Sequence, residues 1–174
     1  SGLAFWPLAE ILKAEAGILD SDPATEIAVK ARASLDELLG TGSEALDAQR
    51  AILGCVGIVG DDGVPESEEV ARRRLVGAWQ AYLDGLASGR PLLVVLEDIH
   101  WADPALLELL EELPSALESA TTLLCLCRRE LFEQHASWGG GAGYRTVIEL
   151  SPLSADESAG LTSHLLGMEA PAEV

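Results

Sequence analysis

The chain has 174 residues and a mass of 18.3 kDa, which is enough for one domain with a full hydrophobic core. Its hydrophobic content of 48% and mean hydropathy of +0.21 exclude a disordered chain, and no apolar run is long enough to cross a bilayer. The net charge of −18, from 29 acidic and 11 basic residues, argues against direct nucleic-acid binding by this segment, because such a surface repels phosphate backbones.

Two further features bear on the cellular location. The first residues lack the basic region and the apolar stretch of a secretion signal, so we expect a cytoplasmic protein without membrane contact. The cysteines are Cys55, Cys125 and Cys127, an odd number without a disulfide framework, which fits a reducing compartment. Cys125 and Cys127 are spaced like half of a metal site, but no second cysteine or histidine pair follows at ligand spacing. A metal site is therefore the less favoured interpretation.

The first half of the chain is predicted to be helical. Asp22-Pro23 is a typical helix start, with a side-chain acceptor at the cap and proline in the first turn, and Gly40 is a typical stop. Apolar residues recur at helical spacing through this half. The predicted helices cover residues 9–16, 23–39, 43–53 and 66–87, with a glycine- and aspartate-rich loop at 57–65.

The second half contains unbroken apolar runs that are typical of strands in a parallel sheet. Residues 92–96 form the first run and residues 121–127 the second, and we expect both strands to be buried on both faces. The helix between them begins at Asp103 and carries a leucine stripe that Pro114 should kink or interrupt. Strand, helix and strand at this spacing form a βαβ unit. A third strand is predicted at residues 145–150.

The expected fold class is therefore α/β, with a parallel sheet and a helical insertion before it. We expect a single partial domain over residues 1–174. A mostly helical region covers 1–88, a βαβ-type core covers 89–150, and the start of a following helical region covers 151–174. Its last helix should open at a capping box made by Ser154 and Glu157, with its leucines facing inward.

The strongest chemical signal comes directly after the first apolar run, where Glu97 and Asp98 stand side by side. Ligands of open α/β sheets bind beyond the carboxyl ends of the strands. Strand alternation sends the two side chains to opposite faces, so one can face a hydrated Mg²⁺ while the other reaches a water near a nucleotide phosphate. The plainer alternative is an ordinary strand end, where the acids meet solvent or cap the next helix.

The full string Glu97-Asp98-Ile99-His100-Trp101-Ala102-Asp103-Pro104 is far more specific than two acids. Here the chain resembles the STAND class of P-loop NTPases, the AAA-like regulatory ATPases of bacterial class III adenylate/guanylate cyclases and of large LuxR-type transcription regulators. Further matching segments occur in the family's order along the chain. Residues 5–10 match before this string, and residues 123–131, which include Cys127-Arg128-Arg129-Glu130-Leu131, residues 138–141 and residues 150–154 match after it.

This resemblance implies a P-loop sheet of the ASCE type, with residues 91–98 as the Walker B strand, and ATP and Mg²⁺ as ligands. Glu97 would order Mg²⁺ through water, although aspartate is commoner there, and Asp98 would polarise the attacking water. Arg128 would sense the γ-phosphate. The alternative for Arg128 is a surface pair with Glu130.

Other residues of the string have plainer interpretations. We expect Trp101 to pack the turn between strand and helix, His100 to support the loop, and Asp103 to cap the helix. The glycines after Trp138 lack the lysine and serine or threonine of a phosphate loop, so they are expected to be a flexible connection.

No Gly-x-x-x-x-Gly-Lys-Ser/Thr motif occurs in the sequence, and Lys13 and Lys30 are its only lysines. The chain therefore resembles a fragment that lacks the Walker A loop and the central strand before it. We expect such a fragment to be inactive alone and to self-associate through exposed sheet edges, or to rearrange residues 145–150.

The expected function is an ATP-binding, ATP-hydrolysing module that controls an effector domain outside this chain. A cyclase-linked parent is favoured over a LuxR-type transcription regulator. The alternative from another class is an interaction scaffold that does not hydrolyse ATP.

Overall fold

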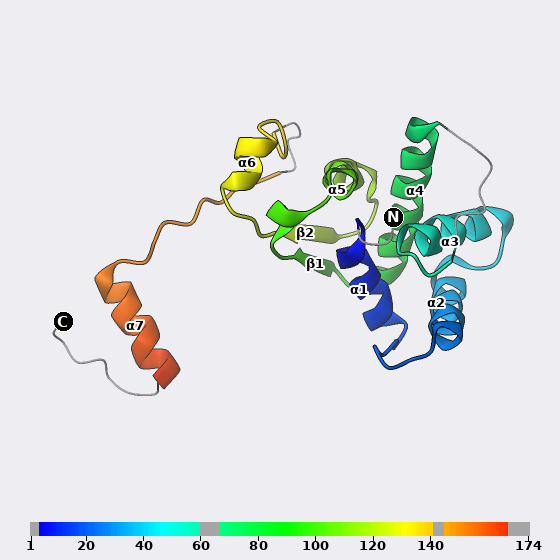
Figure 1. Ribbon diagram of the computed structural model, residues 1–174, viewed down its shortest axis with the longest axis horizontal. Helices are drawn as coiled ribbons and strands as arrows, with labels where there is room; N and C mark the ends of the chain where they lie inside the picture. The colour runs from blue at the N-terminus through cyan, green and yellow to red at the C-terminus, as the bar shows by residue number, and fades with distance from the viewer. Residues whose placement is uncertain (1–3, 60–66, 141–144, 167–174) are drawn as a thin grey trace. The chain divides into compact units, whose positions relative to one another are not determined.

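The computed structural model describes residues 4–59, 67–140 and 145–166 (Figure 1). The chain divides into two compact units, Ser1–Trp138 and Gly139–Val174, which are described separately. The first unit carries all of the candidate site residues.

Four helices open the first unit: α1 (Trp6–Glu15), α2 (Ala24–Leu39), α3 (Ser43–Cys55) and α4 (Glu68–Leu86). They confirm the predicted helical half, with small shifts at their ends. Asp22 does not cap α2, because its carboxylate accepts the backbone N–H of Leu19 at 2.9 Å and binds Lys30 at 2.8 Å. Gly40 ends α2 as predicted, with a φ of 80°. Part of the predicted 57–65 loop lies outside the described residues.

Helix α4 supplies the centre of the core. Trp79 and Tyr82 are fully buried and meet edge to face, with ring centroids 5.5 Å apart. The indole N–H of Trp79 donates to the sulfur of Cys55 at 3.4 Å, which ties α4 to α3. Leucines from α1, α2 and α5 complete the same cluster. Burial of this apolar surface fixes α4, and α4 leads directly to the first strand.

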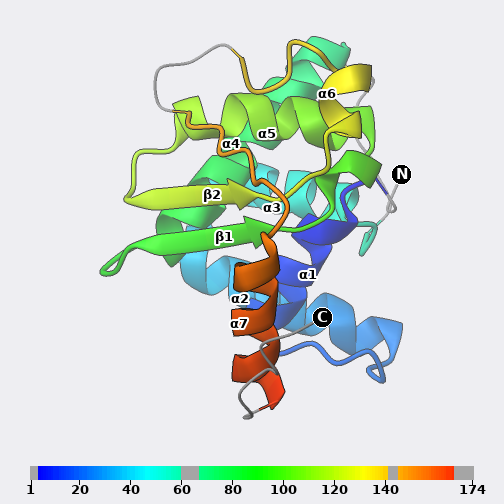
Figure 2. The same ribbon diagram turned by 90° about the vertical axis from the view of Figure 1, so that its left-hand side faces the viewer.

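The predicted βαβ unit is confirmed. Strands β1 (Leu92–Leu96) and β2 (Thr121–Cys125) pair in parallel, with Leu92 opposite Thr121. Figure 2 shows them side by side and pointing the same way, with α5 (Pro104–Ala116) next to β2. Pro114 does not interrupt α5, which continues to Ala116. Proline lacks only its own N–H donor, and the last turn still closes through the N–H of Leu117, which donates to the carbonyl of Leu113 at 3.1 Å.

Within the described residues of the first unit only one face of the sheet is covered, so the prediction of burial on both faces is wrong there. Val94 and Leu96 lie in the core, whereas Leu93 is 60% exposed and Val95 is 47% exposed. Side chains alternate along a strand, and the second face needs a second layer of structure. In the described part of this unit, α1 only borders that face, leaving a groove of about 210 Å³ against β1.

After β2 the chain forms the short helix α6 (Glu130–Gln134). In the second unit, residues 145–150 form no strand, so the predicted third strand is wrong. A strand needs a neighbour for its backbone groups, and the sheet of the described residues has two strands, β1 and β2. Helix α7 (Ala155–Leu166) starts at the predicted capping box, with Ser154 N–H donating to Glu157 at 2.8 Å. Its leucines are exposed rather than inward-facing.

Candidate functional site

The acids Glu97 and Asp98 follow β1 directly and are both exposed. Backbone pairing continues past the ends of the two strands. The N–H of Leu126 donates to the carbonyl of Leu96 at 2.8 Å, and the N–H of Ile99 donates to the carbonyl of Leu126 at 3.1 Å. The two acids therefore lie at the carboxyl edge of the sheet, alongside the end of β2, where ligands of parallel sheets bind.

Asp98 has an unusual backbone conformation. Its φ is 53° and its ψ is 33°, the left-handed region, and no other described non-glycine residue has a positive φ. This conformation costs an L-residue on the order of 1 kcal/mol, and aspartate is among the residues that tolerate it best. It turns the chain from β1 into the short 3₁₀ helix η1 (Ile99–Trp101). Strain of this kind concentrates at functional sites, which supports a functional role for Asp98.

His100 lies beside this turn, with its side chain only 4% exposed. Neither of its ring nitrogens has a hydrogen-bond partner. Its Nδ1 is 3.8 Å from a carboxylate oxygen of Asp98, whose side chain is 75% exposed. A polar ring buried without partners is costly, on the order of 1–3 kcal/mol for each unsatisfied group. The sequence did not indicate this burial, since a single histidine after a strand carries no signal for it.

The prediction that Trp101 packs against the turn between strand and helix is wrong. The residue is 80% exposed, and its ring contacts that of His100 at a centroid distance of 5.1 Å. Local sequence could not decide this, because packing of the indole needs a neighbouring surface. Asp103, by contrast, caps α5 as predicted: its carboxylate accepts the backbone N–H of Ala105 at 2.9 Å. The cap fixes the residue at which α5 begins after Glu97 and Asp98.

Arg128 lies in the turn between β2 and α6, and its residue is exposed. It stands two positions beyond Leu126. The backbone of Leu126 is hydrogen-bonded to Leu96 and Ile99, the residues that flank the two acids. The ladder thus brings Arg128 to the same edge of the sheet as the two acids. No ion pair joins Arg128 to Glu130 within the described residues, so the alternative of a surface pair has no support.

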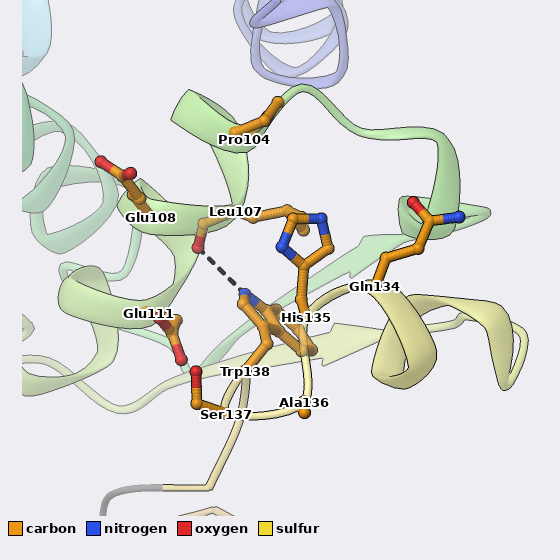
Figure 3. Close-up of a pocket in the computed structure, with 9 residues that line it drawn as sticks. All are labelled: Pro104, Leu107, Glu108, Glu111, Gln134, His135, Ala136, Ser137 and Trp138. Atoms are coloured by element: carbon orange, nitrogen blue, oxygen red, sulfur yellow. Dashed lines mark hydrogen bonds between the residues drawn. The ribbon is translucent and has the colours of Figure 1, made fainter.

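A groove of about 440 Å³ lies between α5 and the segment after α6 (Figure 3). The indole N–H of Trp138 donates to the carbonyl of Leu107 at 3.1 Å and docks this segment on α5. Glu108, Glu111 and His135 also line the groove. Trp138 was singled out in the sequence only as part of a matching segment, because its anchoring role depends on a helix 31 residues earlier.

Two negative observations apply to the described residues alone. Within them, no group of three or more His, Cys, Asp or Glu side chains is arranged to hold a metal ion by itself. Cys125 and Cys127, the two cysteines spaced like half of a metal site, are half-buried. No helix in the described ranges is long and apolar enough to cross a membrane.

A magnesium nucleotide needs oxygen ligands in open space and donors around its phosphates. Glu97 and Asp98 meet the first need, since both carboxylates are exposed at the sheet edge. The second need is not met by the lysines of this sequence. Lys13 bonds Glu10 at 2.8 Å, and Lys30 bonds Asp22 at 2.8 Å and Glu26 at 3.0 Å. The residues present fit the metal-facing half of such a site and not its phosphate-holding half.

Comparison with known proteins identifies the family. The sequence profile described as the AAA ATPase domain matches residues 1–126, which include the four opening helices, β1, Glu97, Asp98 and α5 but not Arg128. No curated protein and no solved structure matches the chain. The mixed helical fold with a small parallel sheet is consistent with this family. The chain belongs to the AAA ATPase domain family.

Proposed function

We propose that this chain carries the acidic edge of an ATP-hydrolysing site in a regulatory ATPase module. The observation that carries the proposal is the backbone ladder that sets Glu97 and Asp98 beside the end of β2. Adjacent exposed carboxylates at the carboxyl edge of a parallel sheet are suited to Mg²⁺ and to a water molecule. Membership of the AAA ATPase domain family supports the proposal that the module binds nucleotide.

Each residue has a distinct role in the proposed reaction. Glu97 would hold Mg²⁺ through water, and the ion would supply neutralisation of the charge on the phosphate oxygens. Asp98 accepts a proton from the attacking water molecule. As the proton leaves, the water oxygen forms a bond to the γ-phosphorus, and the bond between the γ-phosphorus and the β–γ bridging oxygen breaks. Arg128 reaches the γ-phosphate and distinguishes ATP from ADP.

The phosphate-holding loop is proposed to come from a segment outside these 174 residues. The sequence contains no glycine loop followed by lysine, and both of its lysines are engaged in ion pairs. Most nucleotide affinity in P-loop proteins comes from that loop. We therefore expect no Mg-ATP binding to this chain at micromolar levels in a calorimetric titration. Tight binding would mean that other residues form the phosphate site.

The module is proposed to control an effector domain elsewhere in a cytoplasmic signalling protein of the STAND type. A cyclase-linked parent is favoured over a LuxR-type transcription regulator by the likeness of the helical segments. A cyclase domain or a terminal helix-turn-helix in the complete gene product would distinguish the two. The alternative is a scaffold that does not hydrolyse ATP, and the longer Glu97 at the metal position is the feature that favours it.

The test compares variants of the complete gene product. Asp98→Asn should lower turnover by about 100-fold or more while nucleotide binding stays close to wild type, because only proton transfer is lost. Glu97→Gln should raise the Mg²⁺ concentration that turnover requires. Asp20→Asn is the matched control, since the Asp20 side chain is 95% exposed and distant in sequence from the edge. Unchanged turnover in Asp98→Asn would refute the role of Asp98, and a wild-type protein without turnover would favour the scaffold.

A further inference from the structure

We propose that His100 is a positioning residue that holds the carboxylate of Asp98 through a hydrogen bond from Nδ1. The inference rests on the proposed role of Asp98. The evidence is that a buried ring lies next to an exposed carboxylate. The His100 side chain is 4% exposed, the Asp98 side chain is 75% exposed, and Nδ1 of His100 is 3.8 Å from Oδ1 of Asp98.

The histidine is the fixed member of this pair. Its ring is buried beside the turn and lies against the ring of Trp101 at an interplanar angle of 43°. Both nitrogens are buried without a partner, so the site contains donor and acceptor capacity that nothing else in the described residues uses. An ordinary core position would be filled better by an apolar residue of similar size.

The aspartate is the movable member. Its distance of 3.8 Å from Nδ1 exceeds the upper limit of about 3.2 Å for an N–H···O bond. Because the Asp98 side chain is 75% exposed, rotation about its own bonds is the movement by which the proposed hydrogen bond would close. In the proposed arrangement the left-handed backbone fixes the start of the Asp98 side chain, and His100 holds one of its carboxylate oxygens.

The chemistry sets the direction of the bond. A carboxylate can only accept, so the neutral His100 ring must carry its proton on Nδ1 and leave Nε2 as an acceptor. One carboxylate oxygen of Asp98 is then held by His100, and the second oxygen is free to face the attacking water. Loss of the histidine would misorient the base without removing it.

The first test reads the ring directly in the wild-type chain. With ¹⁵N-labelled histidine at about pH 8, where an unperturbed imidazole is neutral, NMR should report the Nδ1–H tautomer for His100. Asp98→Gly removes the carboxylate but tolerates a positive φ, and should abolish that preference. His135 and His164 provide internal controls whose signals should not change. An Nε2–H tautomer of His100 in the wild-type chain would overturn the inference.

The second test uses turnover of the complete gene product. His100→Leu should lower kcat by about 10-fold or more with KM for ATP unchanged, because positioning partners typically contribute that much. His100→Asn keeps a donor near the Nδ1 position and should retain most of kcat, whereas His100→Gln places its donor near Nε2 and should not. Equal losses in all three variants would mean that His100 only packs.

The two proposals fail in distinguishable ways. If Asp98→Asn retains full turnover, the proposed function of Asp98 is wrong. If Asp98→Asn abolishes turnover but His100→Leu does not change it, only the positioning role is wrong. Thermal unfolding of each variant separates a folding defect from either outcome, and the tautomer in the wild-type chain stands whether or not a variant folds.

Discussion

The carboxylate of Asp84, near the end of α4, accepts the backbone N–H of Ser119 at 2.9 Å, 35 residues further along the chain. It also accepts the N–H of Glu118 at 3.2 Å. These bonds tie the helix that precedes β1 to the turn that precedes β2, so they hold the starts of the two strands together. Burial alone would raise the pKa of Asp84, but the hydrogen bonds from Ser119 and Glu118 outweigh it and lower that pKa.

Asp84→Ala should lower the free energy of unfolding at neutral pH by about 1–2 kcal/mol, because two backbone donors lose a charged acceptor. The folded-state pKa lies below the ordinary 3.8, so this contribution is present above the unfolded pKa and is lost as pH falls through the folded value. The difference between wild type and variant in urea unfolding should therefore shrink below about pH 4. Asp20→Ala removes only an exposed ion pair with Lys13 and should show a much smaller difference.

Gly40 and Gly54 make a matched pair for backbone effects, since a Cβ at either position would meet no atom within 4 Å. Gly40 ends α2 with φ 80° and ψ −170°, a region essentially restricted to glycine. Gly40→Ala should therefore destabilise the protein by on the order of 1–3 kcal/mol. Gly54 lies within helix α3, so Gly54→Ala should stabilise it by about 0.5–1 kcal/mol. Chemical denaturation of both variants checks the opposite signs.

Cys55 should be unreactive in the folded chain. Burial raises the pKa of its thiol to about 12, despite the opposing hydrogen bond from the Trp79 indole. Only the thiolate reacts rapidly, so alkylation at about pH 8 should modify Cys55 only after unfolding in urea. Cys127 is only half-buried; burial raises the pKa of its thiol as well, so it should react slowly in the folded state, but ahead of Cys55. Peptide mass mapping distinguishes the two sites, and rapid native labelling of Cys55 would contradict its place in the core.

Self-association through the sheet should be suppressed by a charge on β2. Leu124 is 43% exposed on the uncovered face of this strand, and lysine on an edge strand discourages pairing. Leu124→Lys should shift the chain toward monomer in sedimentation velocity runs at increasing concentration. Leu46→Lys is the control, because Leu46 is 41% exposed on α3 and should leave association unchanged. A wild-type chain that is monomeric throughout would contradict the expected self-association and favour the alternative, rearrangement of residues 145–150.

Elements whose signals lie within a few residues were predictable. Such elements depend only on local hydrogen bonds or on the periodicity of apolar side chains along the chain. They are the apolar run at Leu92–Leu96, the cap at Asp103, the helix end at Gly40 and the capping box at Ser154. The order of strand, helix and strand then sufficed to bring Glu97, Asp98 and Arg128 to one edge, because parallel strands end on the same side. Their chemical roles remain predictions.

Features that depend on a distant neighbour were not predictable. The same apolar pattern that indicated β1 could not show whether Leu93 would be covered. Residues 145–150 have a strand-like sequence but do not form a strand. The burial of His100 and the exposure of Trp101, one residue apart, also follow from what packs around the turn.

The sequence by itself determined the α/β class, the acidic string after β1 and the absence of a phosphate loop within these residues, because each follows from the residue types and their spacing. The tertiary structure alone decided which sheet face is covered, that Asp98 adopts a left-handed backbone, and that His100 lies buried 3.8 Å from its carboxylate. These are properties of packing, since burial and strain depend on atoms that the chain brings together only when it folds.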